Sequence, residues 1–226
     1  SGSVITVHAD GSGSTVQGVE ITNAASGINV LAASDVTLQN LEIHNIGIDK
    51  VNRSGVDNFG INLSSASNFK ILDSEIYDIG RKGIGAIDSD GGLIEGVTLK
   101  DINLDAEHSQ SFDAGGIKLF NTNAVTVKDN KMSKINAFCL WDDLTSNTVI
   151  DGNDITGAGD SFKAPEYNEN VTVAGMYIEK TYNTTVDNNK VTSVDDTRPD
   201  AGTFLAFDAT EFSTESMVLG ENNDFS

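Results

Sequence analysis

The stretch GIKLFNTNAVTVKDNKM, residues 116–132, contains every part of a phrase that recurs along the chain. The phrase opens with Gly-apolar-x-apolar, passes through a polar turn into an alternating strand, and reaches an Asp-Asn corner before a second short strand. Its opening returns as Gly27–Val30, Gly60–Leu63, Gly83–Ala86 and Gly175–Ile178, and Ala137–Leu140 takes the same place with alanine for glycine. Such self-similarity indicates a solenoid, in which each repeat packs on the next.

The second strand of the phrase aligns independently of the first. Where the spacing is shortest, its apolar residue recurs after 22 residues, from Val16 to Leu38, or after 23, from Val127 to Ile150. Alternation with a period of two, without a period of 3.6, indicates strands rather than helices. We expect the equivalent positions to be Val16, Leu38, Ile71, Leu99, Val127, Ile150, Val186 and Leu219.

Polar corners separate these strands, at Asn40, Ser74, Asp101, Asn130, Asn153 and Asn189. Glycine and asparagine suit tight corners because they tolerate left-handed backbone angles. Stacked asparagines can also hydrogen-bond to one another along the axis of a stack. The sequence therefore predicts an all-β fold, a right-handed parallel β-helix of about seven coils. We expect one domain over residues 1–226, consistent with a segment of a larger protein.

These Gly-Ile-x-apolar and Asp-Asn-x-apolar phrases resemble those of the pectin-lyase-like superfamily of right-handed parallel β-helices, and the resemblance covers nearly the whole chain. That superfamily includes polysaccharide lyases and mannuronan epimerases. The phrases occur in β-helices with many functions, so the resemblance implies an architecture rather than an activity.

The formal net charge of −20 is the main feature of the composition. It argues against nucleic acid as a partner, because binding phosphates requires many lysines and arginines. No apolar run is long enough to span a membrane, and the lone Cys139 excludes an intramolecular disulfide. An acidic surface attracts cations and keeps a secreted protein in solution. We therefore expect a secreted or cell-surface monomer, with calcium as the candidate cofactor.

Extra residues gather at one phase of the repeat, at residues 47–59, 105–115, 157–174 and 193–201. Insertions at one phase emerge on one side of a solenoid and often frame a binding face. The strand beside them should point alternate side chains outward, which predicts Phe120 and Trp141 as exposed neighbours. Exposed aromatic rings with polar neighbours suit stacking on sugars. The predicted substrate-binding residues are Phe120, Trp141, Lys82, Asn62 and Glu179.

A uronate lyase or epimerase is the catalytic alternative. It removes a proton beside a carboxylate, and needs a base together with donors that stabilise the developing negative charge. Related β-helix enzymes use Lys, Arg, His and Tyr for these roles. The candidates here are Lys118, His108, Tyr177 and Arg81. The Asp-Pro-His-Glu motif of alginate epimerases is absent, and a surface charge is the simpler reading of each basic residue.

Acidic pairs raise two further hypotheses. Calcium needs several converging oxygen ligands, and Asp88, Asp90, Asp142 and Asp143 are the candidates expected to share one face. A hydrolase resembling polygalacturonases would use Asp88 and Asp142, two coils and thus about 9.6 Å apart. That resemblance is faint, because Asn123 stands where the family has aspartate and the Gly-His-Gly motif is missing.

The interpretation that best fits these observations is an extracellular polysaccharide-binding, adhesion or structural β-helix module of a secreted acidic protein. The alternative is a small lyase or epimerase that acts on an acidic polysaccharide.

Overall fold

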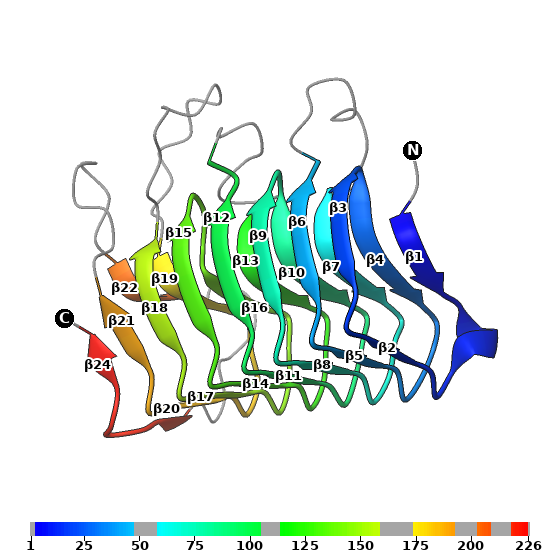
Figure 1. Ribbon diagram of the computed structural model, residues 1–226. Helices are drawn as coiled ribbons and strands as arrows, with labels where there is room; N and C mark the ends of the chain where they lie inside the picture. Colours follow the sequence, from blue (N-terminus) through cyan, green and yellow to red (C-terminus); the bar gives the residue numbers. More distant parts are fainter. Residues whose placement is uncertain are drawn as a thin grey trace.

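The computed structural model describes residues 3–47, 58–104, 114–158, 174–192, 203–208 and 218–225. Three parallel sheets of eight strands each make up nearly all of this part of the chain. Strands of the three sheets alternate along the sequence, so one coil contributes one strand to each sheet (Figure 1). This is the predicted parallel β-helix, with its first and last described coils at opposite ends of the stack.

The strands are as follows. Sheet A contains β1 (Ser3–Val7), β4 (Ser26–Leu31), β7 (Phe59–Ser64), β10 (Lys82–Ile87), β13 (Gly115–Phe120), β16 (Leu140–Asp143), β19 (Ala174–Glu179) and β22 (Thr203–Asp208). Sheet B contains β2 (Thr15–Gln17), β5 (Thr37–Gln39), β8 (Lys70–Leu72), β11 (Leu93–Glu95), β14 (Thr126–Lys128), β17 (Val149–Asp151), β20 (Thr185–Asp187) and β23 (Val218–Leu219). Sheet C contains β3 (Glu20–Ala24), β6 (Glu42–Ile46), β9 (Glu75–Ile79), β12 (Thr98–Ile102), β15 (Lys131–Ile135), β18 (Asp154–Ala158), β21 (Lys190–Thr192) and β24 (Asp224–Phe225). A short 3-10 turn, η1, covers Ala9–Gly11.

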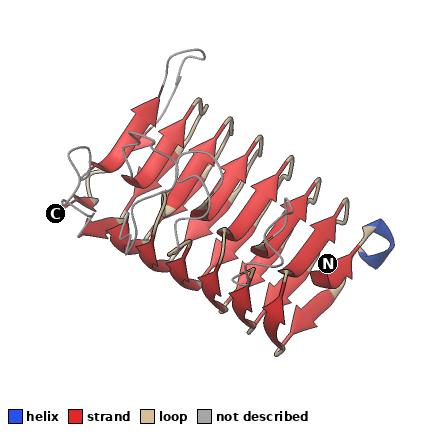
Figure 2. Ribbon diagram, turned by 90° about the horizontal axis from the view of Figure 1, so that it is seen from above, coloured by secondary structure: helices blue, strands red, loops and turns tan. Residues whose placement is uncertain are grey.

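The interior is a narrow column of stacked aliphatic side chains. Equivalent residues of successive coils pair directly, as Ile61, Ile84 and Ile117 do in sheet A. All three are fully buried. Seen from above, the strands lie side by side along the axis (Figure 2). Each buried aliphatic side chain adds about 1.5–3 kcal/mol to folding through removal of its surface from water.

The glycine that opens the repeated phrase is explained by the close approach of the next coil. A Cβ atom at Gly60 would lie 2.7 Å from the carbonyl oxygen of Gly83 and equally close to the Ile76 side chain. Gly27, Gly83 and Gly116 face comparable contacts. The recurrence of glycine at this position therefore reflects lack of space between coils.

Asparagines at the corner between sheets B and C form the predicted ladder. Asn153 Nδ2 donates to Asn189 Oδ1 at 2.9 Å, and Asn153 Oδ1 accepts from the main chain and side chain of Asn130. Asn223 continues the ladder by accepting from Asn189. Asn130, Asn153 and Asn189 are buried, so their amides satisfy main-chain groups that the corner removes from the sheets.

Two parts of the predicted alignment were wrong. In sheet B the position equivalent to Ile71 is Ile94, whereas Leu99 lies in sheet C beside Ile76. The corner in that coil is accordingly at Gly96, whose φ is +68°, rather than at Asp101. The error of five residues arose because Ile94 and Leu99 both occupy apolar positions of alternating strands. Periodicity alone does not distinguish the two positions.

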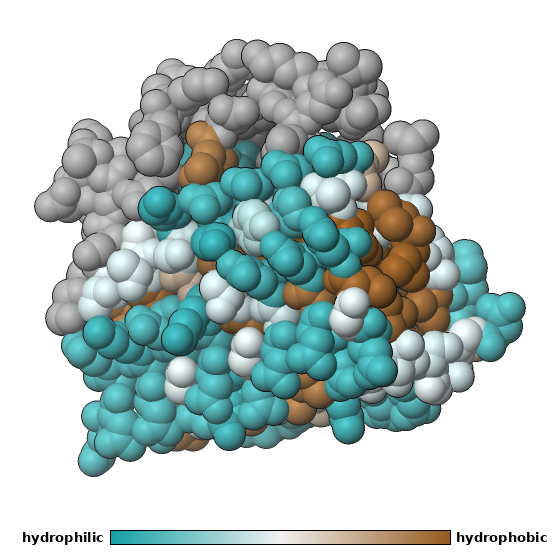
Figure 3. Space-filling model, in the orientation of Figure 1, coloured by the Kyte–Doolittle hydropathy of each residue, from teal (hydrophilic) through white to brown (hydrophobic). Residues whose placement is uncertain are grey.

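The surplus residues fall where the sequence placed them, between a strand of sheet C and the next strand of sheet A. β6 ends at Ile46 and β7 begins at Phe59, whereas β9 and β10 are separated only by Gly80 and Arg81. Hydrophilic side chains cover most of the molecular face seen in Figure 3. In the described parts of the chain, no helix has the length and apolar character needed to cross a membrane.

We predict that Asn153→Ala lowers the free energy of unfolding by about 3 kcal/mol, because it leaves several buried main-chain and amide groups without partners. Asn222→Ala, at an exposed turn, is the matched control and should cost less than about 1 kcal/mol. Equilibrium urea denaturation measures both. Equal losses in the two variants would show that the ladder carries no special stability.

Candidate functional site

The outer face of sheet A carries most of the predicted site residues. The strand register places one outward column through Asn62, Gly85, Lys118, Trp141 and Tyr177. The neighbouring column runs through Ser64, Ile87, Phe120, Asp143 and Glu179. The structure therefore brings Lys118, Phe120, Trp141, Tyr177 and Glu179 to one face, with Trp141 in the column of Lys118 rather than in that of Phe120.

Lys118 is the centre of this cluster. Its Nζ lies 3.1 Å from the centre of the Trp141 ring and 3.4 Å from Asp143 Oδ2. Trp141 Nε1 donates to Glu179 Oε2 at 3.2 Å. The Trp141 ring also packs against Phe138 and Tyr177. A lysine held over an indole face beside a carboxylate is stabilised by both cation–π and ion-pair attraction.

The burial of the cluster contradicts the prediction of exposed stacking rings. Trp141 is only 3% exposed and Lys118 only 9%, while Phe120 is half-buried. Burial raises the pKa of the Asp143 carboxyl, and the ammonium group of Lys118 offsets part of that rise. This face is thus a packed cluster of aromatic and paired charged side chains, and Trp141 presents no open ring to a ligand.

The prediction also placed strand β16 two residues out of register. Leu140 pairs with Ile117 and Trp141 pairs with Lys118, so Cys139 rather than Ala137 stands beside Gly116. Phe138 therefore packs with the outer aromatic cluster instead of the core. The regular interval of 23 residues pointed to the correct register. The hydrophobic pattern favoured a different register, because the correct one puts an aspartate inside the solenoid.

That aspartate is Asp142, which occupies the core position of Leu119 and Ile178 in the adjacent coils. It is fully buried, and Thr184 Oγ1 donates to its Oδ2 at 3.3 Å. Its Oδ1 has no hydrogen-bond partner among the described residues. Burial raises the pKa of Asp142 to about 7, against the opposing effect of the hydroxyl groups of Thr145, Thr184 and Thr148.

The predicted calcium ligands do not converge. Asp142 lies in the core, Asp143 lies on the outer face of sheet A, and Asp88 and Asp90 lie at the corner that follows β10. In the residues that the structure describes, no group of three or more acidic, histidine or cysteine side chains could hold a metal ion. The same separation removes the expected pairing of Asp88 and Asp142 as hydrolase carboxylates, because Asp142 is enclosed.

Three other predicted residues lie in or directly before strands of sheet A, and a fourth falls outside the described residues. Arg81 and Lys82 are buried, and each has its charged group 5.2 Å from the centre of the Phe59 ring. Asn62 is half-buried in the outward column of sheet A. His108 falls outside the described residues.

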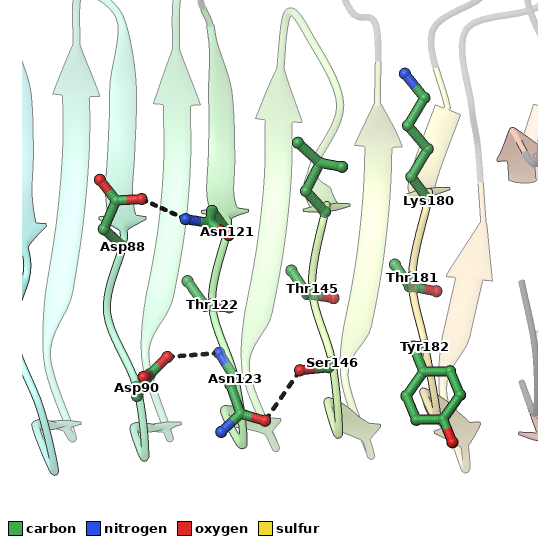
Figure 4. Close-up of a pocket in the computed structure, with 11 residues that line it drawn as sticks. Asp88, Asp90, Asn121, Thr122, Asn123, Thr145, Ser146, Lys180, Thr181 and Tyr182 are labelled. Atoms are coloured by element: carbon green, nitrogen blue, oxygen red, sulfur yellow. Dashed lines mark hydrogen bonds between the residues drawn. The ribbon is translucent and has the colours of Figure 1, made fainter. Parts of the chain in front are cut away.

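A groove that sequence reasoning missed runs along the corner between sheets A and B. It has a volume of about 620 Å³ and crosses four successive coils, those of β10, β13, β16 and β19. Figure 4 shows its lining as three rows parallel to the axis. One bank is Asp88, Asn121, Leu144 and Lys180; the opposite bank is Asp90, Asn123, Ser146 and Tyr182; the floor is Thr122, Thr145 and Thr181.

Local backbone geometry creates this groove. The first-bank residues Asp88, Asn121, Leu144 and Lys180 all have left-handed φ angles between 50° and 55°. The opposite bank is held in register by bridges from Asp90 to Asn123, from Asn123 to Ser146 and from Ser146 to Tyr182. The recurring turn of polar residues after each sheet A strand was the signal in the sequence. In the sequence this turn resembles a simple connection, because the residues of one coil do not show that successive turns stack into a groove.

Hydrogen bonds between coils order the banks (Figure 4). Asn121 Nδ2 donates to Asp88 Oδ1 at 2.6 Å, and the Asn123 main-chain N–H donates to Asp90 Oδ1 at 2.9 Å. Ser146 Oγ and Asn147 Nδ2 both donate to Asn123 Oδ1. At the end of the groove Tyr182 is 52% exposed. The groove therefore combines ordered polar side chains with one open aromatic ring.

Comparison with known proteins agrees with the fold. Residues 59–225 match the family model described as a right handed beta helix region. No curated protein matches the sequence of this chain.

Solved structures of similar shape differ in function. A glycoside hydrolase aligns with a TM-score of 0.51 and 9% identity, over 88% of this chain and 50% of that one. DFA-IIIase from Arthrobacter chlorophenolicus A6 in complex with GF2 gives a TM-score of 0.49 and 12% identity, over 90% and 56%. PfbA, a surface adhesin of Streptococcus pneumoniae, gives 0.45 and 10%, over 94% and 62%. The chain thus spans about half the length of the first of these structures, and the likeness concerns the fold alone.

We predict that stability falls as the pH rises from about 4 to about 7, because folded Asp142 keeps its proton in this range while the unfolded chain releases it. The folded pKa of Asp142 is about 7 and the ordinary value is 3.8. The loss should be on the order of a few kcal/mol and be complete above about pH 8.

Asp142→Asn removes the proton that titrates, and Asp142→Leu restores the apolar column of the neighbouring coils. In urea denaturation at a series of pH values, both variants should gain stability relative to the unaltered protein as the pH rises. A gap that stays constant between pH 4 and pH 8 would contradict a raised pKa at Asp142.

Proposed function

We propose that this chain, which belongs to the right-handed β-helix family, is a polysaccharide-binding module whose ligand lies in the corner groove. The observation that carries this proposal is the groove itself, with two ordered polar banks and an exposed tyrosine at one end. Its volume of about 620 Å³ is in the range of sites that bind small molecules or short segments of a polymer.

The shape of the groove suits a linear polymer. Because neighbouring coils are about 4.8 Å apart, four coils make an open trough about 14 Å long between the first and last rungs. Polar side chains follow one another along the banks, with carboxylates in the coil of β10, amides in that of β13 and a serine hydroxyl in that of β16. They can hydrogen-bond to the hydroxyl groups of successive sugars. The ring of Tyr182 can stack on one sugar face, since its apolar surface is open to solvent.

The outer face of sheet A supports the lyase or epimerase alternative less well. A uronate would need a cation and a base presented to it. Lys118 is instead engaged by Asp143 and the Trp141 ring, and it is nearly enclosed. Binding without turnover is therefore the function that the described residues favour. We propose in addition that the protein is secreted, which fits its strongly acidic composition.

We predict that Tyr182→Ala weakens binding of the polysaccharide ligand about tenfold, through loss of ring stacking. Asn123→Ala should weaken it by a similar factor, because that amide oxygen holds the Ser146 and Asn147 side chains of the next coil in place. Binding is measured by affinity electrophoresis in native gels that contain single polysaccharides. Tyr77→Ala is the matched control, since Tyr77 stacks on His44 on the outer face of sheet C.

Thermal unfolding of each variant shows whether the fold is kept. The proposal fails if a polysaccharide panel yields no retained ligand. It also fails if Tyr77→Ala lowers retention as much as Tyr182→Ala does.

A further inference from the structure

The charges on the groove are unevenly placed. Both carboxylates of the lining, Asp88 and Asp90, belong to the coil of β10 at one end of the trough. Both are exposed, and no ion pair joins either of them to a residue that the structure describes. The only basic residue of the lining, Lys180, lies three coils away, and its Nζ is 3.5 Å from Glu179 Oε1. A ligand therefore meets two unneutralised negative charges at one end.

The groove presents two acceptor-only side chains, both in the coil of β10. Ionised aspartates only accept, and Asp88 and Asp90 each have one carboxylate oxygen beyond the one that bonds across the coils. Each side-chain amide carries two N–H groups, so Asn121 keeps one beyond the one that it donates to Asp88, and the banks also offer donors. The complementary ligand must therefore both donate and accept, which sugar hydroxyl groups do, whereas an ionised carboxylate only accepts.

The floor does not change this balance. The hydroxyl oxygens of Thr122 and Thr181 are enclosed and have no partner among the described residues, so they are out of reach of a ligand in the groove. The hydroxyl of Thr145 is directed to the core, where it influences Asp142. Polar recognition is therefore confined to the two banks, where the acceptors lie.

We infer that the polysaccharide bound in this groove is uncharged and is recognised through its hydroxyl groups; the inference rests on the proposed function. A polyuronate carries a carboxylate on each sugar and would set one against Asp88 and Asp90, where like charges repel. A polymer with an amine on each sugar would be attracted only at the coil of β10, and it would place a cation beside Lys180, where like charges repel. A neutral polymer meets neither conflict.

Affinity electrophoresis of the unaltered protein tests this with three kinds of polymer: neutral β-glucan, xylan and mannan; alginate and polygalacturonate; and a glucosamine polymer. We expect retention by a neutral polymer, with little change between low and high salt because charge attraction does not contribute. Asp90→Asn should weaken that binding about tenfold, through loss of a charge-assisted acceptor.

The double variant Asp88→Asn/Asp90→Asn should increase retention by polyuronates, about fivefold for each charge removed. Asp154→Asn is the matched control, since Asp154 is an exposed aspartate of sheet C, and it should change neither binding. Thermal unfolding monitored by circular dichroism confirms that each variant keeps the fold.

The outcomes distinguish a failure of the inference about the ligand from a failure of the proposed function. Preferential retention by a polyuronate, with or without calcium, overturns the inference while the proposed function stands. Salt-sensitive retention by the glucosamine polymer alone does the same. If no polymer of any kind is retained, the proposed function fails, and the ligand assignment fails with it.

Discussion

Every strand inside the solenoid is hydrogen-bonded on both sides to the equivalent strands of neighbouring coils, and the rest of the molecule follows from this main-chain ladder. The ladder holds successive coils about 4.8 Å apart, so each side chain has its counterpart in the next coil as its nearest neighbour. Gly60 is confined by the carbonyl of Gly83 for this reason. Asn153 finds its partners in Asn130 and Asn189 for the same reason. A residue here is stabilised or strained chiefly by the equivalent residue of the adjacent coil.

Polar side chains inside this stack show two opposite results of that constraint. The asparagine ladder places an amide in each of four successive coils, at Asn130, Asn153, Asn189 and Asn223, and its buried amides find donors and acceptors in the coils beside them. Asp142 is a single carboxyl in an otherwise aliphatic column, so the neighbouring positions, Leu119 and Ile178, offer it nothing polar. Burial then favours the protonated form. A buried polar group that repeats from coil to coil therefore costs little folding free energy, because its neighbours supply its hydrogen bonds. A buried polar group that occurs in one coil alone destabilises the fold.

Repetition also produces the groove. Each of the four turns that line the groove is a short connection with a left-handed residue at its start. Stacking aligns four such turns into two banks and a floor, and a feature that has no depth in one coil becomes a trough over four. The outer face of sheet A differs from this groove, because its aromatic and charged side chains pair with one another across coils. Of these two surfaces, only the first presents ordered polar groups to solvent.

The sequence alone determined the repeat, the parallel stacking, the asparagine ladder and the corner at which the surplus residues lie. These depend on periodicity and on residues such as Gly60 and Asn153, whose roles recur at the equivalent position of several coils. It also brought Lys118, Trp141 and Tyr177 to one face. Only the tertiary structure decided the register of β16, because two features of the sequence disagree. The length of the coil favours the register that buries Asp142, whereas the hydrophobic pattern favours one that does not. Only the structure decided the burial of Trp141 and the existence of the groove. Burial and concavity depend on the residues that neighbouring coils place around a position. The spacing of residues along the sequence does not predict them.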